Sequence, residues 1–495
     1  MSKEQNSYRQ VMRATSLFGG VQVFNILISL IRSKVIAILI GPTGMGIASL
    51  LVSTMGLVNG ITNLGLDRSA VKDISLSNKN DEVDKVSRTI HVLKRLVWFT
   101  ATIGAFVMIV ASPWLSEFAF GNRDYTLSFI WISLALFLKQ LADSQLAILQ
   151  GMRKLKDLAK ANLLGNFIGL LLTVPLYYYF RIDAIVPAII IATLMSFLFT
   201  FYYSRRIELV TEKLSNKEAV SEGKSMIQLG FMLSLSSMIT LFVAYIIQIY
   251  ISQQGGIDEV GLYNAGFVIL NSYVGIIFSA MATDYFPRLA AVSEEIKKIR
   301  SAVFEQALIA VLLIAPIIVL FLMFAPFIIR LLFSKEFLPI VSMVSWGILG
   351  MLFKAVSWSI GYVIIAKGDS NLFIKTAIGF NSILLLFNVM GYYYGGLEGL
   401  GISFFIYYMI HYSALRIITY YRYKFYFKKG FYSIFTLCTI FCVSAFLITF
   451  ISEPVLKYML MGIVALVSLV YSYYHLDKKL DIKDFVGGLF KGKKG

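Results

Sequence analysis

The chain has 495 residues, of which 58% are hydrophobic and only 15% are charged. Soluble proteins contain about 25% charged residues, so this chain has too few charged side chains to cover the surfaces of soluble domains. Its net charge of +17 does not indicate nucleic-acid binding, because the basic residues lie in short runs between apolar segments, as in membrane proteins. The composition therefore predicts an all-α polytopic membrane protein.

Fourteen apolar segments are long enough to cross a bilayer, which takes about 20 residues. In chain order they are residues 14–39, 45–66, 92–116, 126–150, 158–180, 184–203, 225–252, 262–284, 304–330, 338–366, 372–394, 399–421, 432–451 and 454–474. The first segment is too long for the apolar region of a signal peptide. The connecting segments are short and leave no room for a catalytic domain outside the membrane.

Lys and Arg residues gather on one side of these segments. Thirty-four of the 45 lie in residues 1–13, 67–95, 151–160, 204–224, 285–303, 367–371, 422–431 and 475–495, and five lie in the loops on the other side. Because basic loops stay in the cytoplasm, we expect both termini to be cytoplasmic.

An internal repeat relates the two halves of the chain. A shift of 215 residues aligns residues 131–183 with the second half at 13 identities and no gap, and it pairs Lys139 with Lys354 and Gly46 with Gly261. Six segments per unit give two lobes in parallel orientation, a transporter plan with the substrate site between the lobes; a purely structural duplication is the alternative. The predicted parts are an N-lobe (1–203), a cytoplasmic linker (204–224), a C-lobe (225–421), and two added helices with a basic tail (422–495).

Charged residues inside predicted spans are costly and usually face a cavity or a partner. The cations are Arg32, Lys34, Lys139 and Lys354, against the single acid Asp143. This excess predicts a cationic cavity that suits phosphate or pyrophosphate. Lys354 is the strongest candidate because no acid lies one turn away, whereas Lys139 has Asp143 at i+4 and a Lys–Asp pair explains it equally well. Arg32 and Lys34 point to nearly opposite faces, so one of them snorkels to the membrane surface.

Other polar residues in the spans fall into two candidate groups. Residues expected to contact sugars in the cavity are Gln22, Asn25, Tyr245 and Gln248; packing between helices is the alternative. Residues expected to couple ions or to gate are Asp143, Asp284, Asp67 and His411. For Asp67 and Asp284 an interfacial ion pair or a partner at the helix end, and for His411 a packed or hydrogen-bonded ring, are the simpler explanations.

Signatures of enzymes are missing. Gly223-Lys224-Ser225 resembles the end of a phosphate-binding loop, but position 218 is Glu and not the required Gly. The sequence also has no H-E-x-x-H motif and no nucleophile elbow. We therefore expect a transporter that is no enzyme, has no cofactor and no metal, and is driven by an ion gradient or by substrate flux.

Several short motifs occur in order along the chain. They are Ser33-Lys34, Gly41-Pro42-Thr43-Gly44-Met45-Gly46, Phe120-Gly121-Asn122-Arg123-Asp124-Tyr125, Asp258-Glu259-Val260-Gly261, Tyr285-Phe286-Pro287-Arg288-Leu289, and Lys354 with Gly361-Tyr362-Val363-Ile364-Ile365-Ala366-Lys367. Through them the chain resembles the O-antigen and lipid-linked oligosaccharide flippases of the Wzx type, in the polysaccharide transport family of the MOP exporter superfamily. The chain after the twelfth segment matches this family poorly.

The resemblance implies two MATE-like six-helix lobes that alternate between inward-open and outward-open states in the bacterial inner membrane. It implies an undecaprenyl-pyrophosphate-linked oligosaccharide as substrate, and polysaccharide polymerase or assembly proteins as partners besides the lipid bilayer. Lys34 and Lys354 stand where lysine-rich members of the family look similar. A MATE-like multidrug exporter, dependent on acidic residues, is the alternative function. A membrane glycan polymerase is a third, against which the short loops count.

Overall fold

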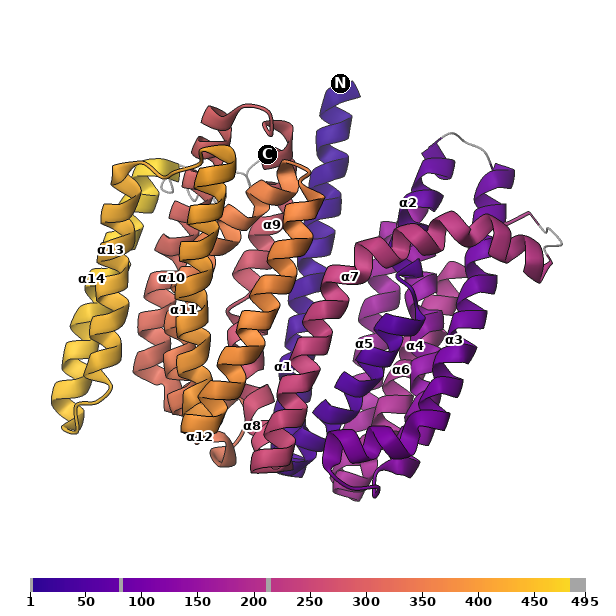
Figure 1. The fold of residues 1–495 in the computed structure, drawn as a ribbon, viewed down its shortest axis with the longest axis horizontal. Coiled ribbons are helices and arrows are strands. Elements are labelled where there is room, and N and C mark those ends of the chain that lie inside the picture. The colour runs from indigo at the N-terminus through magenta and orange to yellow at the C-terminus, as the bar shows by residue number, and fades with distance from the viewer. Residues whose placement is uncertain (1–2, 80–82, 211–214, 481–495) are drawn as a thin grey trace, which may run out of the picture. The chain divides into compact units, whose positions relative to one another are not determined.

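The computed structural model describes residues 3–79, 83–210 and 215–480 (Figure 1). Throughout these residues the chain forms helices and no β-strand, which confirms the predicted all-α class. Ten helical stretches are long and apolar enough to cross a membrane. Helices are the expected solution, because the bilayer core offers no water to bond the N–H and C=O groups of an open strand. The chain is a multi-pass membrane protein.

The described residues form two compact units. Unit 1 holds the residues up to Asn264 together with Leu332–Glu336, and unit 2 holds Ala265–Leu331 and the residues from Phe337 onward. Unit 1 contains α1 (Lys3–Thr62), α2 (Leu66–Lys79), α3 (Val83–Phe120), α4 (Thr126–Gly151), α5 (Leu155–Phe180), the 3₁₀ turn η1 (Arg181–Ala184), α6 (Ile185–Ser204), α7 (Asn216–Gly255) and the start of α8 (Ile257–Val268).

Unit 2 continues from the end of α8. It contains the π-helical turn η2 (Ile269–Tyr273), α9 (Ile276–Ala291), α10 (Ile296–Leu332), α11 (Ile340–Ala366), α12 (Ser370–Tyr423), α13 (Lys429–Ile448) and α14 (Pro454–Leu480), while the short η3 (Lys335–Phe337) lies at the boundary of the units. The boundary thus falls inside α8 and after α10, beyond the linker 204–224. The division into lobes at residues 203 and 225 stays a prediction.

Three of the apolar stretches are too long for one crossing. Phe24–Thr62, Leu155–Ser204 and Ser370–Tyr423 contain 39, 50 and 54 residues, whereas a straight helix needs about 20 residues to cross the hydrocarbon core. Each stretch contains one residue with non-helical backbone angles, at Gly41 (φ 63°, ψ −167°), Arg181 (φ 52°, ψ −124°) or Gly396 (φ 55°, ψ −138°). The breaks divide each stretch into two shorter helices.

These breaks support the internal repeat. Six of the ten positive φ angles in the described residues form pairs that lie 215 residues apart, at Gly41 (63°) and Gly256 (87°), at Arg153 (54°) and Gly368 (68°), and at Arg181 (52°) and Gly396 (55°). A positive φ is uncommon outside glycine, so the match at Arg153 and Arg181 does not follow from glycine placement alone. The two halves of the chain therefore share positive φ angles even at positions where their residues differ.

Glycine also allows a reciprocal contact between the halves, within unit 1. A Cβ atom on Gly46 would lie 2.0 Å from the carbonyl oxygen of Ile257, and a Cβ atom on Gly261 would lie 2.0 Å from the carbonyl oxygen of Pro42. Pro42 and Gly46 are the repeat mates of Ile257 and Gly261, so α1 and α8 approach each other through equivalent positions. Side chains of any size are excluded there, since real Cβ atoms do not come this close to backbone oxygens.

We predict that Gly46→Ala weakens the contact of α1 with α8 and lowers the free energy of unfolding by about 1–3 kcal/mol, the usual cost of overpacking. Gly56→Ala, in the same helix, is a matched control, because no atom lies within 4 Å of its added Cβ. That variant is expected to be neutral or to stabilise the helix by roughly 0.5–1 kcal/mol. Thermal unfolding of the purified proteins in detergent measures the difference; equal melting temperatures for the two variants would contradict the contact.

Asp369 connects the two ends of α12. Its carboxylate accepts a hydrogen bond from the backbone N–H of Leu372 (3.2 Å), pairs with Arg422 (3.0 Å), and accepts the hydroxyl of Tyr423 (3.2 Å). The Leu372 hydrogen bond first, and then the Arg422 guanidinium, hold the pKa of the Asp369 carboxyl below its usual value. Because α12 is broken at Gly396, this cluster joins its first and last turns.

Asp369→Asn should therefore lower the melting temperature slightly at neutral pH. A depressed pKa in the folded state makes its contribution in full above the unfolded pKa of about 3.9, and the contribution disappears as the pH falls through the folded pKa. The melting temperatures of wild type and variant should converge on acidification below that range. A difference that persists unchanged in acid would show that the carboxylate charge is not responsible.

Candidate functional site

Lys354 lies in the middle of α11 in unit 2. Its ammonium donates a hydrogen bond of 2.6 Å to the side-chain oxygen of Asn271. Among the residues that the structure describes, no carboxylate pairs with it. Because its hydrogen-bond partner is a neutral amide, no described acid compensates this half-buried basic group, and it is available to an anion.

Three aromatic rings surround the Lys354 ammonium. The ring centroids of Phe278, Phe404 and Tyr408 lie 5.9, 5.9 and 5.2 Å from Nζ. Rings at this distance stabilise a cation by roughly 0.5–2 kcal/mol each, without cancelling its charge. The sequence pattern indicates Lys354 but none of these aromatic neighbours, since the three rings come from α9 and α12 and only the fold brings them next to α11.

Asn271 is a second neighbour of Lys354 that the sequence pattern did not indicate. It lies in the π-helical turn η2, Ile269–Tyr273, a kind of helix irregularity that often occurs at functional sites. Its side-chain nitrogen donates to the carbonyl oxygen of Phe267 at 3.4 Å, which turns the side-chain oxygen of Asn271 toward Lys354. An asparagine in the apolar segment 262–284 was the signal that could have identified it.

His411 lies close to this cluster on α12. Its ring packs on Phe380 (4.3 Å between centroids), Tyr407 (5.6 Å) and Tyr408 (5.9 Å). Its Nδ1 atom is buried without a hydrogen-bond partner in the described residues. The His411 ring therefore packs on Tyr408, which also contacts Lys354. The role of His411 in ion coupling stays a prediction.

In unit 1 the repeat mate of Lys354 is neutralised. Lys139 pairs with Asp143 at 3.1 Å, one turn along α4, so the Lys–Asp pair weighed from the sequence is present. Asp143 lies with Asp67 of α2 in one hollow of about 440 Å³, lined by Asp67, Arg68, Val71, Asp143, Leu146, Ala147 and Gln150. The fold thus brings together Asp67 and Asp143, two acids whose proximity the sequence did not predict.

The neighbours of that hollow are polar. Asn63 donates to the Asp67 carboxylate at 2.8 Å, and Arg68 donates to the carbonyl of Leu233 (2.9 Å) and the hydroxyl of Ser237 (3.1 Å) on α7. Arg68 therefore bonds to α7. Of the two simple explanations for Asp67, the described residues show a polar partner at the helix end, Asn63, and no ion pair with Arg68.

Lys34 and Arg32 are the two candidate cations on α1. The ammonium of Lys34 donates to the backbone carbonyl of Phe333, just after α10, and it has further interactions. Arg32 is half-buried in the same helix. Lys34 thus connects the short segment Leu332–Glu336 to α1, within unit 1. Whether Lys34, Arg32 or Lys139 also contacts substrate stays a prediction.

The residues expected to contact sugars lie in contacts between helices. Asn25 accepts a hydrogen bond from Asn166 of α5 (3.1 Å), Tyr245 accepts one from Thr54 of α1 (2.9 Å), and Gln248 donates to Asn264 (3.3 Å). Tyr245 and Gln248 are 5% and 7% exposed, as the packing alternative requires. The side chains of Gln22 and Asp284 lie outside the described part of the structure, which gives only their helical backbone in α1 and α9.

The comparisons with known proteins agree with this picture. A sequence model of the family described as "Polysaccharide biosynthesis protein" matches residues 35–342. The chain is 23% identical over 368 residues to the lipid III flippase of Escherichia coli K12, which covers 72% of this chain and 86% of that protein; the Shigella flexneri lipid III flippase matches equally well.

Two solved structures share the fold. The lipid II flippase MurJ in an inward closed conformation has a TM-score of 0.69 at 14% identity, covering 93% of this chain and 99% of its own. An inward-facing MATE family transporter of the MOP superfamily has a TM-score of 0.67 at 16% identity, covering 81% and 94%. The resemblance to Wzx-type flippases is thereby confirmed, and the comparisons support a transporter and not an enzyme. Since the family model covers more than half of its length, the chain belongs to the polysaccharide biosynthesis protein family.

Proposed function

We propose that this protein is a flippase that moves an undecaprenyl-pyrophosphate-linked oligosaccharide, an O-antigen or similar surface polysaccharide unit, from the cytoplasmic to the periplasmic leaflet of the bacterial inner membrane. The observation that carries the proposal is Lys354, a cation inside the membrane with an amide partner and aromatic neighbours but no described counter-charge. A pyrophosphate supplies the missing negative charge. The flippase relatives and the family assignment support the same class of substrate.

The proposed mechanism uses the surroundings of Lys354. The Asn271 oxygen accepts one N–H of the ammonium. The pyrophosphate replaces this neutral bond with a charge-assisted one, which is roughly twice as strong. Sugars would occupy an aqueous space between the lobes while the prenyl chain stays in lipid, and rocking of the lobes would expose the head group on the other side.

The proposed topology has fourteen crossings with both termini in the cytoplasm. Three of the ten membrane-crossing stretches are double, at Gly41, Arg181 and Gly396. In addition, α8 and α9 have 12 and 16 residues, each too short alone, and they would together form one crossing. The arrangement of Lys and Arg gives the orientation.

Lys354→Gln should weaken recognition of the pyrophosphate. Losing a hydrogen-bonded charge pair costs about 1.5–3 kcal/mol, so the affinity of the purified protein for undecaprenyl-pyrophosphate-linked sugar should fall by roughly 10- to 100-fold. Lys375→Gln, an exposed lysine of the same unit, is the matched control and should bind as wild type does. A lipophilic cation is tested in parallel; cation binding that ignores Lys354 but requires Asp143 would instead favour a MATE-like exporter.

Asn271→Asp provides an independent test of the charge at Lys354. The new carboxylate would lie within hydrogen-bond distance of the ammonium, pair with it and occupy the place of the substrate anion. The variant should remain folded but bind the lipid-linked sugar at least about tenfold more weakly, whereas Asn271→Ala, which leaves the charge uncompensated, should still bind it. Unimpaired binding by Asn271→Asp would mean that the anion site lies elsewhere.

A further inference from the structure

A groove of about 580 Å³ runs between α3 and the first turns of α7 in unit 1. One face of α3 forms one wall, because its lining residues recur with helical spacing: His91, Lys94, Arg95, Trp98, Phe99 and Thr102. Asn216, Ala219 and Val220 of α7 line the other wall. None of these residues belongs to the site around Lys354 or to the hollow at Asp67.

The groove changes character along α3. Its beginning is basic, with His91, Lys94 and Arg95, and one turn later it becomes aromatic and exposed, with Trp98 58% and Phe99 63% exposed. Exposed apolar side chains continue to the end of α3, among them Phe106, Val110, Trp114 and Phe118. Because α3 is a membrane-spanning helix, such a face fits contact with lipid, and the change at residues 95–98 marks the level of the lipid head groups, where Trp is enriched.

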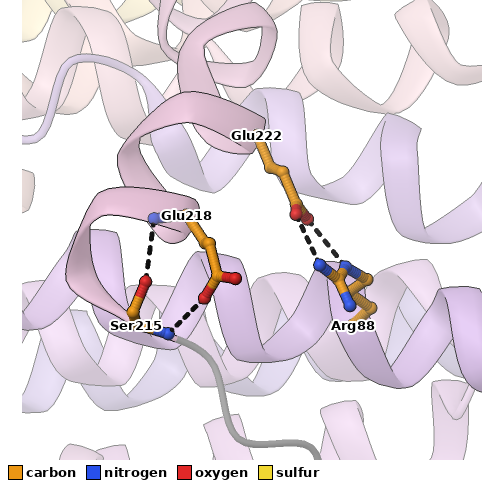
Figure 2. A network of polar contacts seen from close by, with 4 residues as sticks. All are labelled: Arg88, Ser215, Glu218 and Glu222. Carbon is orange, nitrogen blue, oxygen red and sulfur yellow. Dashed lines mark hydrogen bonds and ion pairs between the residues drawn. The ribbon is translucent and has the colours of Figure 1, made fainter.

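The two walls are fixed to each other. Arg88 donates two hydrogen bonds to the Glu222 carboxylate, at 2.9 and 2.6 Å, and Ser215 and Glu218 form a reciprocal cap at the start of α7 (3.2 and 2.7 Å), as Figure 2 shows. Figure 1 shows the first part of α7 lying across the helices of unit 1 before it turns. The groove is therefore a preformed feature of unit 1.

These same contacts leave the groove positively charged. Two acids at the start of α7 already have partners, Glu222 in Arg88 and Glu218 in the backbone N–H of Ser215. Among the described residues, Arg95 donates only to the neutral side chain of Asn216. His91 uses Nδ1 to donate to the carbonyl of Ser87 (2.7 Å), and no described residue hydrogen-bonds or ion-pairs with Lys94.

We propose that this groove binds one membrane phospholipid with an anionic head group. Its phosphate would lie between Lys94 and Arg95, and an acyl chain would follow Trp98 and Phe99 along α3. Basic side chains above an apolar floor match such a lipid in both charge and position, whereas a free phosphate ion would leave the aromatic floor without a partner. This site is separate from the proposed transport site, and its occupancy does not require that the protein flips lipid-linked sugars.

The test compares two phospholipids with identical acyl chains, phosphatidylglycerol and phosphatidylcholine, by native mass spectrometry of the full-length protein in detergent. Wild type should retain the anionic lipid preferentially. Lys94→Gln/Arg95→Gln should reduce retention of phosphatidylglycerol by about tenfold or more, from the attraction that each basic residue contributes near a membrane surface. Retention of phosphatidylcholine, whose choline cation offsets the phosphate charge, should fall much less. The matched control is Lys154→Gln/Lys156→Gln, which removes two exposed lysines elsewhere in unit 1 and should bind as wild type does.

Two further variants make the outcome decisive. Trp98→Ser should weaken retention of both lipids, because it removes the apolar floor and not the charge. Lys354→Gln should retain phosphatidylglycerol normally, so failure of the transport proposal would not affect this result. Equal retention of phosphatidylglycerol by wild type and Lys94→Gln/Arg95→Gln would overturn the proposal. So would complete displacement of the lipid by millimolar inorganic phosphate, which would indicate a site for a soluble anion.

Discussion

The need to bond every backbone N–H and C=O inside the bilayer determines most of this structure. It requires helices throughout the membrane, and it confines changes of direction to the few residues whose backbone leaves the helical region. Gly41, Arg181 and Gly396 are three such residues, and they divide stretches of up to 54 residues. Arg181 and Gly396 are repeat mates of each other, and Gly256 is the repeat mate of Gly41. All four residues have positive φ angles, so the positions of the breaks are a property of the duplicated unit.

Charge compensation distinguishes the two halves of that duplication. Lys139 and Lys354 are repeat mates, but only Lys139 has an acid one turn away, Asp143. In the second half this place is taken by Trp358, whose ring packs on Phe278 (5.6 Å) and Tyr285 (5.7 Å). This difference replaces an ion pair with aromatic packing and leaves Lys354 without a described acidic partner. The first half thus contains a Lys–Asp pair, and the second half contains a lysine that no described acid compensates.

The helices that follow the repeat alter the second half further. Trp346 donates to Glu398 (3.1 Å), and its ring packs on Phe446 of α13 (4.4 Å). In the first half the repeat mates Trp131 and Asp183 are both exposed, Trp131 by 56%. Within unit 2, α13 therefore covers a surface whose counterpart in unit 1 stays open. Cys442 fits this packing role, with its thiol directed at the Ala315 carbonyl of α10 (3.7 Å).

The sequence by itself determined the helical class, the membrane location and the repeat, and it indicated Lys354 as a candidate, because hydrophobicity, charge and spacing are properties of the linear chain. It also predicted an ion pair for Lys139, and packing between helices for Tyr245 and Gln248, as alternatives that agree with the structure. Only the tertiary structure decided that Asn271 and Tyr408 surround Lys354, that Asp67 and Asp143 share one hollow, and that α3 and α7 form a basic groove. Each of these sites joins helices whose rotation about their own axes depends on packing against neighbours, and no pattern within one helix reveals which of its faces meets another.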